Sequence, residues 1–287
     1  MTYKNTKSFQ AFINSPFRSI KHKSYFNVYD ALLEEYIGKE ITFVEVGVLD
    51  GGSLFMWRDF FGDNARIIGI EINESAKVWR DHGFEIFIGS QSDPMFWKDF
   101  YKKIGSVDIL LDDGGHTYQQ QIITVESAFP NVNPGGKIIV EDTYTSYQKE
   151  YGYPSKSSFI KYAANLVDGI NLRTPKIKTN KDPNKLIYSL SFFESIVAIN
   201  IAETEGLALA EGIPNKGAIL EKQADSLRYA DKPTLTRVEN LIFGFKSLQK
   251  IPLLGGALKS AGVFFTKILK LINNKVDNIK LRKYFRY

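Results

Sequence analysis

From residue 41 onward, short apolar runs alternate with stretches of helical spacing. The apolar runs of strand length are residues 41–46, 66–71 and 84–88. Between them, residues 54–61 and 74–82 place apolar side chains at the spacing of helices that bury one face. This alternation is typical of a parallel sheet whose faces are covered by helices.

The same alternation supplies two more strands. Pro94 opens a helix predicted over residues 94–104, and an apolar run begins at Val107. A further helix is expected over residues 118–129. A turn at residues 133–136 then leads into the fifth strand. Before this region, residues 25–37 have helical spacing and precede Gly38, a predicted helix stop.

After the fifth strand the pattern changes. Residues 186–193 and 195–201 are two β-rich runs separated by Glu194, and they predict an antiparallel hairpin. Five parallel strands closed by such a hairpin is the order of class I methyltransferases. We therefore predict an α/β, Rossmann-like fold with a seven-stranded, mostly parallel sheet, a C-terminal antiparallel hairpin and a helical C-terminal appendage.

This pattern divides the chain into four segments. We predict an N-terminal arm and helix at 1–38, with the first 23 residues as a loose arm, and a cofactor-binding methyltransferase domain at 39–202. A polar connecting segment at 203–245 and a basic amphipathic helical tail at 246–287 complete the chain. Its length of 287 residues suits one large domain with an appendage.

Composition narrows the classes of function and location. The chain has no cysteine, which excludes a thiolate metal site and a cysteine nucleophile. Neither a signal peptide nor an apolar run of membrane-spanning length is visible, so we expect a cytoplasmic protein. No nucleic-acid-binding motif is found, and we expect no nucleic-acid partner.

The net charge of +5 is concentrated in the tail. Residues 246–287 hold ten lysines and arginines against one acid, Asp277. Apolar residues recur there at helical spacing, from Ala261 to Ile279. One interpretation is a helix that packs on its own domain or on another copy in a homo-oligomer. The other is an interfacial helix that makes peripheral contact with the inner face of the membrane.

Acidic residues gather where two predicted strands end. The run that starts at Val107 ends in Asp112-Asp113-Gly114-Gly115-His116, and the next strand ends in Glu141-Asp142. Ligands of such sheets bind just outside the carboxyl ends of the strands. Up to four carboxylates and one imidazole would meet there, which is costly unless a cation binds. The alternative is two solvated loops, with His116 as a helix cap.

A second set of residues matches S-adenosylmethionine binding. An acid inside the first strand is followed by a glycine turn, an acid ends the second strand, and the third strand has a polar end. A nicotinamide dehydrogenase would instead show GxGxxG, which is absent from this turn. The predicted cofactor-binding residues are Glu45, Gly47, Gly51, Ser53, Glu71, Ser90, Gln91 and Asp112.

These motifs resemble the metal-dependent sugar O-methyltransferases of the macrocin and mycinamicin type, and the related cephalosporin hydroxylase family. The matching pieces are Val44-Glu45-Val46-Gly47-Val48 with Gly51-Gly52-Ser53, Asp113-Gly114-Gly115-His116, Glu141-Asp142 and the hairpin around Phe192-Phe193-Glu194-Ser195-Ile196-Val197. The resemblance covers residues 40–202. Family members usually have an acid where this chain has Ser90, so Gln91 or Asp93 would substitute.

The resemblance implies that Asp113, Glu141 and Asp142 bind a divalent cation and that His116 is the general base, with His116 and Asp113 as catalytic residues. Oxygen ligands favour Mg²⁺, with Mn²⁺ or Ca²⁺ as alternatives. Adjacent strand residues point to opposite faces, so Glu141 and Asp142 reach one ion only if the backbone twists there.

The expected function is transfer of a methyl group from S-adenosylmethionine to a sugar hydroxyl of a glycan or glycosylated metabolite. A catechol-type O-methyltransferase and a non-catalytic scaffold with the same fold are the alternatives. An oxygenase with a 2-His-1-carboxylate iron site is disfavoured because it needs two histidines. Two of the three histidines in the chain, His22 and His82, belong to none of the acidic groups described above.

Overall fold

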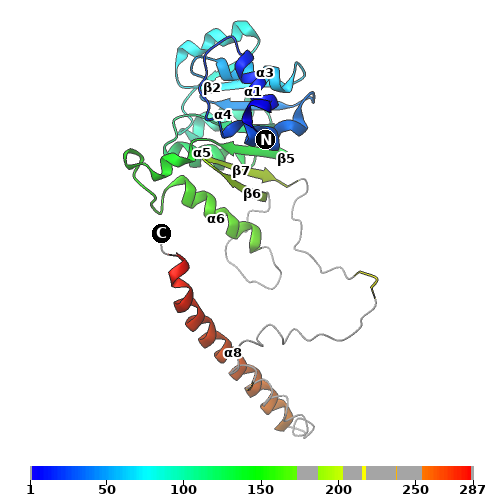
Figure 1. The fold of residues 1–287 in the computed structure, drawn as a ribbon, viewed down its shortest axis with the longest axis vertical. Coiled ribbons are helices and arrows are strands. Elements are labelled where there is room, and N and C mark those ends of the chain that lie inside the picture. The colour runs from blue at the N-terminus through cyan, green and yellow to red at the C-terminus, as the bar shows by residue number, and fades with distance from the viewer. Residues whose placement is uncertain (1, 173–186, 203–214, 218–236, 238–253, 286–287) are drawn as a thin grey trace. The chain divides into compact units, whose positions relative to one another are not determined.

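The computed structural model describes residues 2–172, 187–202, 215–217, 237 and 254–285. It divides into two compact units, Met1–Ile213 and Pro214–Tyr287. Figure 1 shows the sheet and its covering helices in the first unit and the long helix α8 in the second. The predicted connecting segment 203–245 lies outside the described residues except at 215–217 and 237.

A seven-stranded sheet of order β3-β2-β1-β4-β5-β7-β6 organises the first unit. Strands β1 to β5 are parallel, whereas β7 pairs antiparallel with both β5 and β6. The predicted fold and its terminal hairpin are thereby confirmed. The strands are β1 Thr42–Val46, β2 Arg66–Glu71, β3 Glu85–Ile88, β4 Val107–Asp112, β5 Val132–Val140, β6 Ile187–Phe193 and β7 Ile196–Ile201.

Helices cover both faces of this sheet (Figure 1). Because strand side chains alternate, Phe43 and Ile109 pack in one core layer with α1, α2 and α3, while Val44 and Leu110 pack in the other with α4, α5 and α6. The α-helices are α1 Lys7–Asn14, α2 Tyr25–Leu33, α3 Gly52–Phe61, α4 Pro94–Ile104, α5 Tyr118–Ala128, α6 Phe159–Asn171 and α8 Leu254–Leu281. The 3-10 helices are η1 Tyr3–Asn5, η2 Glu34–Tyr36, η3 Glu74–His82, η4 Thr143–Tyr147, η5 Lys149–Tyr151 and η8 Arg282–Phe285.

Several elements differ from their predictions. The helix predicted over 74–82 is present with those bounds and is of the 3-10 type, whereas β5 already begins at Val132, before the expected turn. Our prediction of a loose arm over the first 23 residues was wrong. This segment contains η1 and α1, and the Thr6 hydroxyl caps α1 by accepting from the Phe9 N–H.

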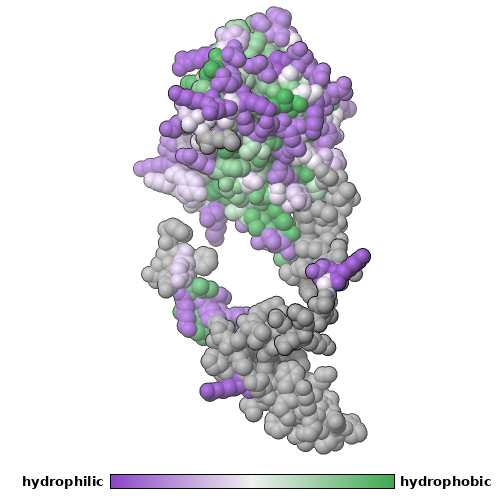
Figure 2. All heavy atoms as spheres, turned by 45° about the vertical axis from the view of Figure 1, so that its right-hand side comes forward, coloured by the Kyte–Doolittle hydropathy of each residue, from purple (hydrophilic) through white to green (hydrophobic). Residues whose placement is uncertain are grey.

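The second unit is described through α8 and η8. Helix α8 runs through Gly255 and Gly256, where we expected a break. Hydrophobic side chains at Phe265, Ile268 and Ile272 are exposed, and hydrophilic side chains also reach the surface of this helix (Figure 2). Among the described residues, no helix is long and apolar enough to cross a membrane.

Candidate functional site

A cavity of about 730 Å³ opens at the carboxyl ends of the five parallel strands β1 to β5. Its walls are the loops that follow these strands, together with residues 18–22 from the N-terminal segment. This is where ligands of open α/β sheets bind, since neighbouring parallel strands end at the same edge.

The β1 loop forms one wall of the cavity and requires glycine at its first turn. Gly47 has φ +91°, and an added Cβ would lie 2.1 Å from the carbonyl oxygen of Asp113. Behind the turn, Ser53 Oγ and Trp57 Nε1 donate to Glu45 at 2.7 and 3.0 Å. Burial raises the pKa of Glu45 to about 7, although nearby Lys21 opposes the rise. Glu45 thus joins β1 to the start of α3.

Glu71 ends β2 and holds the same loop through its carboxylate. One oxygen accepts the N–H groups of Val48 and Leu49, at 2.9 and 3.1 Å. The other accepts those of Ile72 and Asn73, at 2.8 and 3.1 Å. Burial alone would raise the pKa of Glu71, but the four donors outweigh it and lower the pKa below its ordinary value. Glu71, a predicted cofactor-binding residue, is therefore also an anchor of the glycine loop.

Gln91 connects the β3 end to the turn after β4. Its Nε2 donates to Asp112 at 2.9 Å, and its Oε1 accepts the N–H of Gly115 at 2.8 Å. An added Cβ on Gly114 would lie 2.0 Å from Gln91 Oε1, so this approach requires glycine. Asp112 is fully buried, and burial raises its pKa. Gln91 therefore supports the turn that presents Asp113 and His116.

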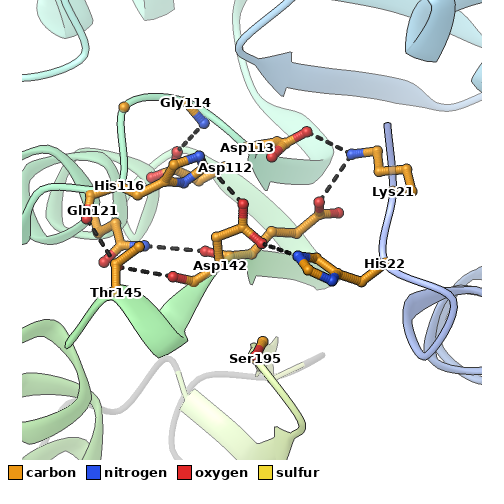
Figure 3. Close-up of polar contacts among 12 residues, drawn as sticks. Lys21, His22, Asp112, Asp113, Gly114, His116, Gln121, Asp142, Thr145 and Ser195 are labelled. Atoms are coloured by element: carbon orange, nitrogen blue, oxygen red, sulfur yellow. Dashed lines mark hydrogen bonds and ion pairs between the residues drawn. The ribbon is translucent and has the colours of Figure 1, made fainter. Parts of the chain in front are cut away.

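Asp113, His116 and Asp142 converge on one point of the cavity wall (Figure 3). One potential ligand atom from each lies within 4.8 Å of the others. His116 and Asp142 both adopt left-handed backbone, with φ +58° and +53°. The Thr145 hydroxyl contacts their carbonyl oxygens at 3.1 and 2.9 Å. The strand end thus has the twist needed to turn Asp142 toward Asp113.

Glu141 faces a neighbour that the sequence analysis missed. Lys21 Nζ lies 2.9 Å from Glu141 Oε2, 2.6 Å from Asp113 Oδ2 and 3.9 Å from Glu45 Oε1. Tyr29 donates to the other Glu141 oxygen at 2.5 Å. Burial disfavours the Lys21 ammonium, but the surrounding carboxylates hold its pKa well above the ordinary value. Burial also raises the pKa of Glu141, to about 8, against the opposing effect of Lys21.

Two further side chains from the N-terminal region contact Asp142. The Tyr25 hydroxyl donates to its carboxylate. His22 Nε2 lies 3.9 Å from Asp142 Oδ1, so our interpretation of His22 as a histidine without acidic neighbours was wrong. These contacts join segments more than a hundred residues apart, and no local sequence signal indicated them.

The predicted site residues occupy two positions relative to the cavity. Gly47, Ser53, Glu71, Ser90, Gln91, Asp113, His116, Glu141 and Asp142 line it. Glu45, Gly51 and Asp112 lie outside this lining. Glu45 and Asp112 are completely buried. Either could contact a cofactor directly only if the loops in front of it moved.

The donor set suits a hard divalent cation. Asp113 and Asp142 offer carboxylate oxygens beside His116 Nε2, and the buried Nδ1 of His116 has no hydrogen-bond partner among the described residues. Lys21 shows that a positive charge is already accommodated between Asp113 and Glu141. Carboxylate oxygens are the ligands that Mg²⁺, Mn²⁺ and Ca²⁺ share.

Sequence comparison places these motifs among methyltransferases. Residues 44–143 match the family model described as a methyltransferase domain. An 8-demethyl-8-alpha-L-rhamnosyl tetracenomycin-C 2'-O-methyltransferase from Streptomyces olivaceus is 31% identical over 52% of this chain and 41% of its own. A demethylmacrocin O-methyltransferase from Streptomyces fradiae is 30% identical over 43% of this chain and 33% of its own. The match spans less than half the length of these relatives.

Comparison of structures gives the same fold. The MycE methyltransferase of the mycinamycin biosynthetic pathway, solved in complex with Mg, SAH and mycinamycin VI, superposes with a TM-score of 0.63. The two chains are 22% identical, and the superposition covers 81% of this chain and 60% of MycE. The chain therefore has the fold of the MycE methyltransferase, and its residues 44–143 match the methyltransferase-domain family and are similar to the O-methyltransferases named above.

Proposed function

We propose that this protein is an S-adenosylmethionine- and divalent-cation-dependent O-methyltransferase that acts on a sugar hydroxyl. The observation that carries the proposal is the convergence of Asp113, His116 and Asp142 on the wall of a cavity beside the β1 glycine loop. Relatives named as O-methyltransferases of a rhamnosyl tetracenomycin and of demethylmacrocin favour a glycosylated small molecule as the acceptor.

Each group of residues has a proposed role. Gly47, Ser53, Glu71, Ser90 and Gln91 would border the cofactor, and Glu45, Gly51 and Asp112 would shape this wall from outside the lining. Asp113, Glu141 and Asp142 would hold the cation, preferably Mg²⁺. When bound, such a cation stabilises negative charge that develops on the hydroxyl oxygen.

His116 would remove the hydroxyl proton. Its imidazole is 20% exposed, and its Nε2 lies 3.4 Å from Asp142 Oδ2. A carboxylate at this distance orients the ring, so that a ring nitrogen can accept the hydroxyl proton. Asp113 would align the acceptor oxygen, because proton removal and methyl transfer both depend on the position of that oxygen.

A methyl-transfer assay tests this function directly. Full-length protein is incubated with methyl-labelled S-adenosylmethionine and Mg²⁺, in parallel with glycosylated macrolide-type acceptors, glycan fractions and catechol. Cation-dependent labelling of a sugar hydroxyl supports the proposal. Labelling of catechol alone would favour the catechol-type alternative, and absence of cofactor binding by calorimetry would favour a non-catalytic scaffold.

We also propose that α8 makes peripheral contact with an anionic membrane surface. Exposed Phe264, Phe265, Ile268, Ile272 and Ile279 fall within one broad face of the helix. Lys267 and Lys280 lie on either side of that face, and Lys275 falls within it. Such a helix can bury its apolar side at the interface while its lysines remain among charged headgroups.

A further inference from the structure

Lys21 occupies the place where two of the proposed cation ligands meet. Its ammonium nitrogen lies 2.6 Å from Asp113 Oδ2 and 2.9 Å from Glu141 Oε2, and its side chain is only 1% exposed (Figure 3). Both oxygens are therefore within hydrogen-bond distance of one positive charge. A cation ligated by these oxygens would have to share them with Lys21 or replace it.

The segment that carries Lys21 is held firmly on both sides. Upstream, Ser15 Oγ donates to the Gly52 carbonyl at 2.8 Å, and an added Cβ on Gly52 would lie 2.4 Å from the Phe17 carbonyl oxygen. Downstream, α2 begins at Tyr25, which contacts Asp142. Between these anchors, residues 18–22 line the cavity, and Lys21 bonds to its far wall. We call residues 18–22 the strap.

Charge repulsion makes it unfavourable for the Lys21 ammonium and a divalent cation to bind the same carboxylates at the same time. The Lys21 ammonium and a divalent ion on the same carboxylate oxygens would be like charges a few ångströms apart in a buried site, where water screens them weakly. A divalent ion also compensates more of the charge of Asp113, Glu141 and Asp142 than one ammonium does. Departure of Lys21 would remove the hydrogen bonds that join the strap to Asp113 and Glu141, just after β4 and β5, and would leave His22 near Asp142.

We propose that Lys21 is a built-in competitor of the divalent cation, so that cation binding expels its ammonium and releases the strap from the cavity wall. This inference rests on the proposed cation site. Without the cation, Lys21 neutralises Asp113 and Glu141 and keeps the strap closed. With the cation bound, the middle of the strap around Lys21 is free to move while its ends stay anchored, and access to the cavity becomes linked to occupancy of the site.

Cation affinity of the full-length protein tests the competition independently of turnover. Mn²⁺ binding is measured by titration calorimetry and electron paramagnetic resonance, for the unmodified chain, Lys21→Met and the matched control Lys23→Met, which alters an exposed lysine of the same segment. We expect Lys21→Met to bind Mn²⁺ at least about tenfold more tightly, because buried carboxylates lose their internal counter-charge. Lys23→Met should match the unmodified chain.

A second measurement does not depend on how well Lys21→Met folds. Since the chain lacks cysteine, Ile20→Cys places one fluorophore on the strap, at a side chain that is 75% exposed. Addition of Mn²⁺ should lower its fluorescence anisotropy. The same label at Val78→Cys, on η3, should not respond.

The outcomes separate this inference from the proposed function. Equal Mn²⁺ affinity in all three proteins, or weaker binding by folded Lys21→Met, would overturn the role of Lys21 and leave the cation site standing. Mn²⁺ binding without any change at the Ile20→Cys label would overturn release of the strap. No Mn²⁺ binding by any protein would remove the cation site and the competition together.

Discussion

His116 Nε2 lies 3.4 Å from Asp142 Oδ2, and both residues adopt the left-handed backbone that side chains other than glycine rarely take. Such conformations cost about 1–3 kcal/mol each and persist where surrounding contacts impose them. Here the Thr145 hydroxyl contacts the carbonyl oxygens of both residues. Two loops from neighbouring strands are thereby tied together at the point where we place the chemistry.

Replacement of His116 by glutamine should show whether His116 acts as a general base or as a cation ligand. We expect turnover to fall by about 10²–10⁴, the usual contribution of general base catalysis. Affinities for S-adenosylmethionine and Mn²⁺ should stay within about twofold, since the proposed ligands are carboxylates. The measurements are labelled methyl transfer and calorimetry. A large loss of Mn²⁺ affinity would instead make His116 a ligand.

Thr145→Val should impair positioning without removing a reacting group. The hydroxyl fixes the two strained carbonyl groups, so its loss should lower turnover by about tenfold, equivalent to about 1.4 kcal/mol. Cofactor affinity should be unchanged, and Thr145→Ser should restore turnover because it retains the donor. If Thr145→Val kept full turnover while Thr145→Ser lost it, the methyl group rather than the hydroxyl of Thr145 would matter.

Removal of the cation should abolish turnover and its return should restore it. Chelation with EDTA takes away the charge that offsets Asp113, Glu141 and Asp142, and excess Mg²⁺ replaces it. Asp142→Asn should weaken Mn²⁺ binding, whereas Asp99→Asn on α4, away from this cavity, provides the control. Full turnover in excess EDTA would contradict cation dependence.

The sheet and the carboxylate group were predictable because their signals are local. Strand runs, glycine turns and acids at strand ends lie next to one another in the sequence, and parallel strands bring those ends together. The 3-10 form of residues 74–82 was not predictable in this way. Its two buried side chains, Ala76 and Trp79, are three residues apart, a spacing that suits both helix types.

Lys21 escaped prediction for a different physical reason. Its partners Asp113 and Glu141 are 92 and 120 residues away, and the surrounding arm has no periodic pattern. Only the packing of α1 and α2 on the sheet places the strap at the cavity. Likewise, the ending of β2 in Glu71 was visible in the sequence, but its bonds to four backbone N–H groups depend on the folded loop.

Helix α8 should bind anionic vesicles in a salt-dependent manner. In co-sedimentation with the full chain, we expect binding to phosphatidylserine vesicles and little to neutral ones, since each lysine near an anionic surface contributes about 1 kcal/mol. The double variant Phe265→Ser with Ile272→Ser should lose binding, because both side chains are exposed apolar groups of α8. Unchanged sedimentation with a shift to a smaller oligomer would indicate self-association instead.

Glu71→Gln should reduce stability in a pH-dependent manner. The folded state lowers the pKa of Glu71 below its ordinary 4.5, because four N–H donors favour the ionised form. Its stabilisation is therefore fully present above the unfolded pKa and is lost as pH falls through the folded pKa. In denaturant melts without cofactor, the variant should be about 2–3 kcal/mol less stable at pH 7. This difference should shrink below pH 4.5. Glu74→Gln, at an exposed carboxylate, should show neither effect. A difference independent of pH would mean that shape rather than charge makes Glu71 stabilising.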